Sequence, residues 1–217
     1  MIAKAFAGLA FLLAVIAAAL FVPARTLDYW QAWMVLATFG ASNLAITIYL
    51  AVRDPALLAR RTKAGPIAEP TLAQKIIQSI ASLAFVAVFV VAGLHHADRR
   101  VLAIAGDVLI VLGLVFVALV FRANTFTSAT VEVKPEQQLV STGPYAIVRH
   151  PMYAGALLML LGVPLALASW PAFIPVAVIV AVIVVRLLAE EKLLVVELAG
   201  YAEYRERVRY RLIPFVW

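Results

Sequence analysis

The 217-residue sequence contains no cysteine and few charged residues, and each absence excludes a class of protein. Without cysteine the chain forms no disulfide and offers no thiolate to a metal ion or a redox partner, and we expect no metal site. Only 14% of the residues are charged, against about 25% in typical soluble domains. No G-x-G-x-x-G stretch occurs, which argues against a soluble dinucleotide-binding fold.

Apolar residues dominate what is present: they make up 65% of the chain, and the mean hydropathy is +1.00. A membrane-spanning helix needs about 17–25 mostly apolar residues. Segments that approach this length cover residues 2–22, 30–52, 76–94, 101–121, 153–169 and 172–188. The sequence therefore predicts an all-α, polytopic membrane protein with about six hydrophobic helices, the last two forming a helical hairpin. A signal peptide would have a shorter apolar region than residues 2–22, so we expect this helix to be retained.

The distribution of basic residues predicts an orientation. With six spans and the N-terminus inside, fifteen of the 18 Lys and Arg residues lie on one side, and Arg25, Arg99 and Arg100 lie on the other. Because basic loops stay in the cytoplasm, we expect both termini, the long loops and a C-terminal helix to be cytoplasmic, in a bacterial inner membrane. The charge follows the membrane flanks without a compact motif, so nucleic acid is not an expected partner.

Two features of the first half of the chain bear on its structure: a basic loop and a carboxylate within an apolar segment. The loop RDPALLARRTKAGPIAEP, residues 53–70, carries three prolines and predicts an interfacial helix with turns at either end. Asp107 is a carboxylate within an apolar segment, a position that is by default a functional candidate. Because it lies about two turns from Val101, near the expected membrane surface, we favour a structural role for it.

A polar stretch separates the fourth and fifth apolar segments and reads RANTFTSATVEVKPEQQLVSTGPYAIVRHPMYAG, residues 122–155. Loops of this length are commonly functional or disordered. Pro151 predicts a helix start, which makes His150 the N-cap, where free backbone N–H groups and the helix dipole attract an anion. Arg149 adds a positive charge. The alternative is that both side chains anchor the helix to lipid phosphate.

A second polar cluster follows the last apolar segment, where Glu190 and Glu191 lie close to the membrane surface. Arg186 precedes Glu190 by four residues, so the two predict an ion pair along one helix face. Glu191 points about 100° away and is expected to remain free. Beyond Gly200, Tyr201 and Tyr204 recur at helical spacing, which is also typical of an amphipathic interfacial helix.

Together these clusters resemble the isoprenylcysteine carboxyl methyltransferase family, which shares a signature with the phospholipid methyltransferases. The resemblance rests on TGPYAIVRHPMYAG at residues 142–155, EEKLLVVELAGYAEYRERV at residues 190–208 and RLIP at residues 211–214. It implies a membrane enzyme that uses S-adenosylmethionine to methylate a lipophilic acceptor, such as the carboxylate of an isoprenylcysteine-like molecule, among membrane lipids. Within a single membrane domain, residues 1–121 would be scaffold, and residues 122–217 would bind the cofactor and carry catalysis.

The resemblance also implies roles for individual residues. Arg207 and Arg149 would be catalytic. The cofactor would be bound by Gln137, Leu139, Gly143, Pro144, Tyr145, His150, Tyr153, Glu190, Glu191, Tyr201 and Tyr204. Gln137 stands where many relatives have histidine, and a glutamine cannot shuttle a proton at neutral pH. A carboxylate acceptor needs no general base, whereas an amine or thiol does.

Other functions remain open on the sequence. A phospholipid N-methyltransferase belongs to the same class of enzyme. A membrane reductase on the related sterol-reductase scaffold would hold a nicotinamide cofactor in a similar C-terminal pocket, and a lipid-binding or transport protein would have no catalytic activity. The sequence specifies neither the methyl acceptor nor the oligomeric state.

Overall fold

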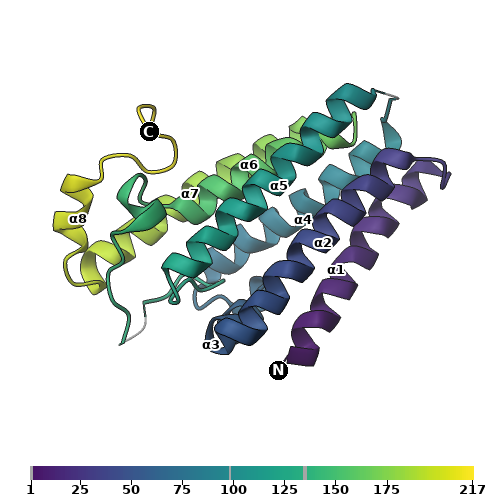
Figure 1. Ribbon diagram of the computed structural model, residues 1–217. Helices are drawn as coiled ribbons and strands as arrows, with labels where there is room; N and C mark the ends of the chain where they lie inside the picture. The colour runs from purple at the N-terminus through teal and green to yellow at the C-terminus, as the bar shows by residue number, and fades with distance from the viewer. Residues whose placement is uncertain (1, 98, 134–135) are drawn as a thin grey trace.

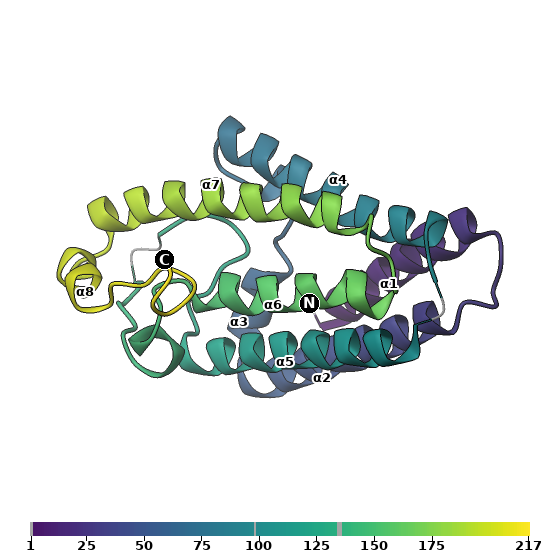
Figure 2. The same cartoon turned by 90° about the horizontal axis from the view of Figure 1, so that it is seen from above.

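The protein is a bundle of long helices, seen from the side in Figure 1 and from above in Figure 2. The computed structural model describes residues 2–97, 99–133 and 136–217, and no strand occurs in this part of the chain. The α-helices are α1 Ile2–Ala24, α2 Trp30–Arg53, α3 Pro55–Arg61, α4 Leu72–Leu94, α5 Arg100–Ala123, α6 Pro151–Ala166, α7 Phe173–Glu197 and α8 Tyr201–Arg207. Two short 3-10 turns are η1 Pro66–Ala68 and η2 Gly143–Ala146. The prediction of an all-α fold is confirmed.

Five of these helices are long and apolar enough to cross a membrane: α1, α2, α4, α5 and α7. Each has 23–25 residues, a length of about 35–38 Å at the α-helical rise per residue. α6 is also apolar but has 16 residues. It ends before the predicted boundary because Ala168 adopts a left-handed φ of 52° and the N–H of Ser169 turns back to the Pro164 carbonyl oxygen. These helices fit an integral membrane protein, as the composition predicts.

α5 and α6 pack closely because glycines face each other along the contact. A Cβ atom on Gly106 would lie 2.6 Å from the carbonyl oxygen of Gly162, and one on Gly113 would lie 2.7 Å from the carbonyl oxygen of Gly155. Real side chains do not approach backbone atoms this closely. Small residues allow membrane helices to come this near, so the glycines fix the position of α6 along α5.

α6 and α7 follow each other in the chain, as the predicted hairpin requires, but the two helices diverge in space. α6 lies along α5, whereas α7 packs mainly against α4 (Figure 2). Arg186 of α7 donates hydrogen bonds to the side-chain oxygens of Gln74 and Gln78 on α4, at 3.3 and 3.2 Å. The glycine contact therefore holds α6 to one side while these polar contacts hold α7 to the other.

The segment between α2 and α4 contains the helix that the sequence predicts there. The carboxylate of Asp54 caps α3 by accepting a hydrogen bond from the backbone N–H of Leu57 at 2.8 Å, and Pro55 occupies the first helical turn. Leu57 and Leu58 are buried against Phe121 of α5. α3 is thus fixed at the end of the bundle where α5 ends, beside the long loop that follows α5.

Candidate active site

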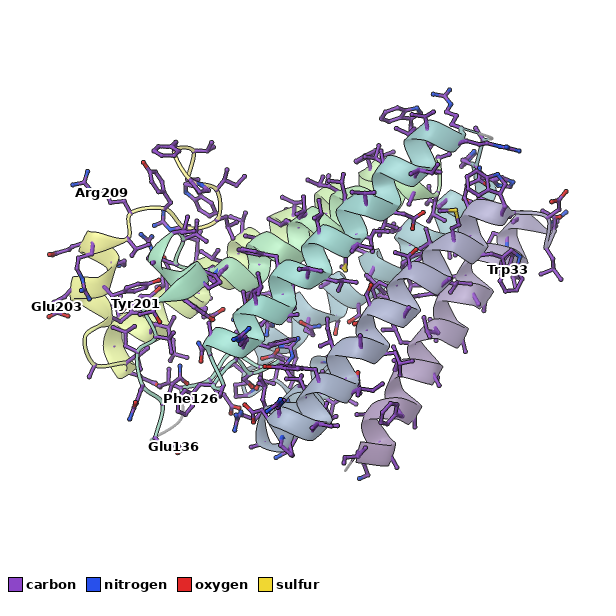
Figure 3. All side chains as sticks on the ribbon, viewed as in Figure 1. Trp33, Phe126, Glu136, Tyr201, Glu203 and Arg209 are labelled. Atoms are coloured by element: carbon purple, nitrogen blue, oxygen red, sulfur yellow. The ribbon has the colours of Figure 1, made fainter. Side chains whose placement is uncertain are left out.

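One cavity of about 900 Å³ extends from the membrane helices into the loop after α5. At one end it is lined by apolar side chains of α1, α4, α6 and α7, among them Phe11, Phe85, Leu160 and Ile183. At the other end it is lined by polar groups of the loop, the start of α6, the end of α7, and α8. Figure 3 labels Phe126 and Tyr201, which border the cavity from the loop and from α8. The cavity therefore has one apolar end and one polar end.

Most of the residues predicted for the site line this cavity, although they come from separate parts of the sequence. They are Gln137, Leu139, Tyr145, Arg149, His150, Tyr153, Glu190, Tyr201 and Tyr204. The fold brings them together because α8 and the tail after it return to the start of α6: the backbone N–H groups of Arg149 and His150 donate to the carbonyl oxygens of Tyr210 and Arg211, each at 2.9 Å.

Glu190 faces the cavity, but its partner is not the one that helical spacing predicts. The predicted ion pair between Arg186 and Glu190 is wrong: Arg186 pairs with Glu69, with 2.7 Å between Nη2 and Oε1. Glu190 instead accepts a hydrogen bond from the Tyr153 hydroxyl at 2.7 Å. The same hydroxyl accepts from Nε of Arg186 at 3.2 Å. Glu190 therefore presents a carboxylate to the cavity without a guanidinium paired to it within the described residues.

Glu191 is buried and fully engaged, so the prediction that it remains free is also wrong. Its side chain is 5% exposed and lies against three basic groups. Oε1 accepts from Nε of Arg149 at 2.7 Å and lies 3.3 Å from Nε2 of His150. Oε2 accepts from Nε of Arg211 at 2.9 Å. The two neighbouring glutamates thus differ in environment: Glu190 faces the cavity, and Glu191 joins α6, α7 and the tail.

Arg149 and His150 occupy the position predicted for them at the start of α6. His150 is the N-cap residue and Pro151 is in the first turn. The guanidinium of Arg149 donates from Nη1 to the carbonyl oxygens of Val208 and Arg209, at 2.9 and 2.8 Å, besides its contact with Glu191. Both side chains are buried, at 6% and 5% exposure. Arg149 therefore holds the tail against α6, and this arrangement argues against a direct contact with lipid phosphate.

Three tyrosines close the polar end of the cavity. The Tyr204 hydroxyl donates to the carbonyl oxygen of Tyr145 at 2.7 Å, and the Tyr145 hydroxyl accepts from the side chain of Asn124 at 3.0 Å. Burial raises the pKa of Tyr145 to about 12 and raises the pKa of Tyr201 and of Tyr204 as well. The Tyr201 hydroxyl is buried without a hydrogen-bond partner among the described residues. The phenols therefore stay protonated at neutral pH, and that of Tyr201 is available to a ligand.

Some predicted site residues lie outside the cavity lining. Gly143 and Pro144 begin the η2 turn next to Tyr145. Glu191 lies behind Arg149 and His150, as described above. Arg207 is exposed in the last turn of α8, and Asp107 is buried in α5; neither lines the cavity.

Several cavity residues come from the part of the chain that is predicted to be scaffold. Arg61 at the end of α3 and Gln78 on α4 line the cavity. Glu69, before α4, accepts a hydrogen bond from the backbone N–H of Val131 at 3.3 Å and so holds the loop that covers the cavity. A sequence signal for α4 exists, because Gln74 and Gln78 lie four residues apart, on one face, in the first turns of a mostly apolar helix. No comparable signal singles out Arg61 among its basic neighbours.

A search of curated proteins returns no match to the chain. Residues 101–198, which run from the first turn of α5 through the end of α7, match the model of the phospholipid methyltransferase family. Over these residues the match confirms the resemblance to the isoprenylcysteine and phospholipid methyltransferases that is expected from the sequence.

Proposed function

We propose that the protein transfers a methyl group from S-adenosylmethionine to a lipophilic acceptor, such as the carboxylate of an isoprenylcysteine-like molecule. The observation that supports this most strongly is that one cavity has both a polar end at the loop and an apolar end among the membrane helices. A water-soluble donor and a lipid-soluble acceptor need this combination, because each arrives from a different phase. The matched family is a methyltransferase family, which agrees with the proposal.

The residues at the polar end fit S-adenosylmethionine. This donor carries an ammonium and a sulfonium, which need a nearby carboxylate, and hydroxyl and carboxylate groups, which need hydrogen-bond donors. Glu190 presents a carboxylate that, among the described residues, is bound only by the Tyr153 hydroxyl. The Tyr201 hydroxyl is a buried donor without a partner in the described part of the chain. Leu139 and the ring of Tyr145 supply apolar surface beside these groups.

In this proposal the chain positions the reactants and excludes water. When bound, S-adenosylmethionine supplies a methyl group on a positively charged sulfur. Glu190 would bind the cationic part of the donor, while His150, Tyr153, Tyr201, Tyr204 and Gln137 would border it. Gly143 and Pro144 would contribute through the turn that places Tyr145, and Glu191 through its contacts with Arg149 and His150. Positioning of this kind accounts for much of the rate gain in a transfer between two bound groups.

The acceptor would occupy the apolar end of the cavity. Phe11 of α1, Phe85 and Val86 of α4, and Val182 of α7 line it there, and they would contact a prenyl or acyl chain. A carboxylate acceptor is already an anionic nucleophile, so Gln137 in place of a histidine creates no difficulty for its methylation.

A phospholipid amine is the second candidate acceptor, and the description of the matched family favours it. An ammonium must lose a proton before it can accept a methyl group. Glu190 lines the cavity, and within the described ranges it hydrogen-bonds only to a hydroxyl, so it would take that proton in this case. The two acceptors therefore assign different work to the same carboxylate.

We also propose an orientation in the membrane and a division of the chain into a part that binds the cofactor and a part that supports it. The element order places the α2–α4 loop, the α5–α6 loop and α8 at one end of the bundle, with the start of α1. We assign this end, with both termini, to the cytoplasm, because most basic residues lie there. Residues 122–217 would carry most of the cofactor site, and residues 1–121 would support it.

Transfer of labelled methyl groups tests the function and separates the two acceptors. The purified protein is incubated with S-adenosylmethionine labelled in the methyl group and with either a prenylcysteine analogue or phosphatidylethanolamine. A methyl ester releases its label as methanol in alkali, whereas an N-methyl group does not. We expect alkali-labile label in the prenylcysteine product. Failure of the protein to bind S-adenosylmethionine in calorimetry, with binding of NADPH instead, would contradict the proposal in favour of a reductase.

A further inference from the structure

Arg61 differs from the other two arginines that line the cavity, because no carboxylate in the described part of the chain pairs with it. Arg149 pairs with Glu191 and Arg186 pairs with Glu69. Arg61 forms no ion pair with any described residue. Its Nη1 donates to the carbonyl oxygen of Ser128 at 2.9 Å, and its guanidinium lies over the ring of Phe121, 5.2 Å from the ring centre. Its positive charge therefore remains uncompensated beside the cavity.

The surroundings of Arg61 increase the free-energy cost of leaving its charge without a partner. The residue is only partly exposed, and burial together with the nearby charge of Arg186 lowers its pKa. A buried charge without a partner is unfavourable, and a guanidinium has five N–H donors to satisfy. Within the described residues, a protein acceptor satisfies only one of the five, an N–H on Nη1. The remaining donors are free to bind an anion that enters the cavity.

We propose that Arg61 binds the anionic group of the methyl acceptor, a carboxylate or a phosphate, at the junction of the polar and apolar ends of the cavity. This inference rests on the proposed function and names the charge that its acceptor must carry. The cavity lining also includes Gly8 and Phe11 of α1, beside which an acyl or prenyl chain would extend. Glu190 would attract the cationic donor while Arg61 attracts the anionic acceptor, so each reactant would bind at its own position in the cavity.

Arg60 provides a matched control. It precedes Arg61 on α3 and also donates a hydrogen bond to the backbone of the loop, at the Thr125 carbonyl oxygen. Unlike Arg61, it does not line the cavity. Arg60→Gln and Arg61→Gln therefore remove the same charge from the same helix and weaken the same kind of loop contact. Only Arg61→Gln removes a charge that faces the cavity.

The experiment measures binding without catalysis. Dissociation constants are determined in detergent for two pairs of ligands: a farnesyl thioether carboxylate with its carboxamide, and phosphatidylethanolamine with diacylglycerol. We expect the native protein and Arg60→Gln, in at least one pair, to bind the member that carries the carboxylate or the phosphate ten times more tightly than the member that lacks it. In Arg61→Gln the preference should fall below threefold, with the affinity for S-adenosylmethionine unchanged. The pair that shows the effect identifies the anion as a carboxylate or as a phosphate.

Several results would overturn the inference: no preference in the native protein for either pair, a preference that survives in Arg61→Gln, or a loss of S-adenosylmethionine affinity in Arg61→Gln instead. If Arg61→Gln does not fold, Arg61→Lys serves in its place, and we expect a reduced preference because an ammonium lacks the guanidinium fork. Anion preference through Arg61 without methyl transfer would contradict the proposed function alone. Methyl transfer that is indifferent to Arg61 would contradict this inference alone.

Discussion

Replacement of Glu191 by glutamine should destabilise the fold, although its neighbour Glu190 tolerates the same change. Glu191 accepts hydrogen bonds from Arg149 and Arg211 and lies beside His150. Glutamine has the same size but no charge, so Arg149, at 6% exposure, would be left as a buried cation without a counter-ion. Breaking a buried ion pair from one side costs about 3–5 kcal/mol. Arg211 adds less, because its side chain is 30% exposed and water can replace the contact.

This loss of unfolding free energy corresponds to a decrease of roughly 6–20 °C in Tm for a domain of this size. Thermal unfolding in detergent measures it, and Trp217 supplies a local reporter because the guanidinium of Arg211 lies 5.0 Å from the centre of its ring. Glu190→Gln is the control: we expect its Tm within about 2 °C of the native value and its affinity for S-adenosylmethionine reduced at least tenfold, about 1.4 kcal/mol. If Glu191→Gln keeps the native Tm but loses donor binding, the assignment of the two glutamates is reversed.

The other predictions concern separate parts of the molecule. Tyr201→Phe removes a buried hydroxyl that has no partner in the described part of the chain, so unfolding experiments should show no loss of Tm, while calorimetry should show weaker donor binding by about 1 kcal/mol. Gly113→Val should separate α5 from α6 and lower Tm strongly, because a Cβ there would lie 2.6 Å from the backbone nitrogen of Met159; Gly8→Ala, with nothing within 4 Å of the added Cβ, should leave Tm unchanged or slightly higher. Arg207→Ala should retain turnover within about twofold, since the side chain is exposed and outside the cavity lining; a large loss of turnover with intact donor binding would instead support the catalytic role that the resemblance implies.

The sequence predicts the helices well because their apolar segments match the length of a membrane span. Their ends are less predictable. The predicted fifth segment extends to Ser169, yet α6 stops at Ala166, where the chain turns through the left-handed conformation of Ala168. Glycine is the usual residue in this conformation, so an alanine gives no sequence signal of the turn. The divergence of α6 from α7 depends on contacts with α5 and α4, which the local pattern does not contain.

In the site, as in the fold, the sequence predicts features that depend on neighbouring residues and does not predict contacts between residues far apart in the chain. His150 and Pro151 begin a helix as predicted, because the signal lies in adjacent residues. The pairing of Arg186 with Glu190 fails because spacing along one helix does not reveal that Glu69 arrives from another segment. The prediction that Glu191 is free fails for the same reason: its partners Arg149 and Arg211 lie 42 and 20 residues away in sequence.

The shortness of α6 has a consequence for the membrane around it. Gly155 packs against Gly113; from there α5 continues to Ala123, about 15 Å, whereas α6 reaches its start at Pro151 after about 6 Å. The N-cap of α6 therefore lies roughly 9 Å deeper along the bundle than the end of α5. A bilayer that meets this recess has a local hydrophobic mismatch, which is relieved by thinning of the lipid layer beside the short helix. Thinner lipid there would shorten the distance between the headgroup layer and the polar end of the cavity, so membrane thickness itself becomes a variable that sets access to the cavity.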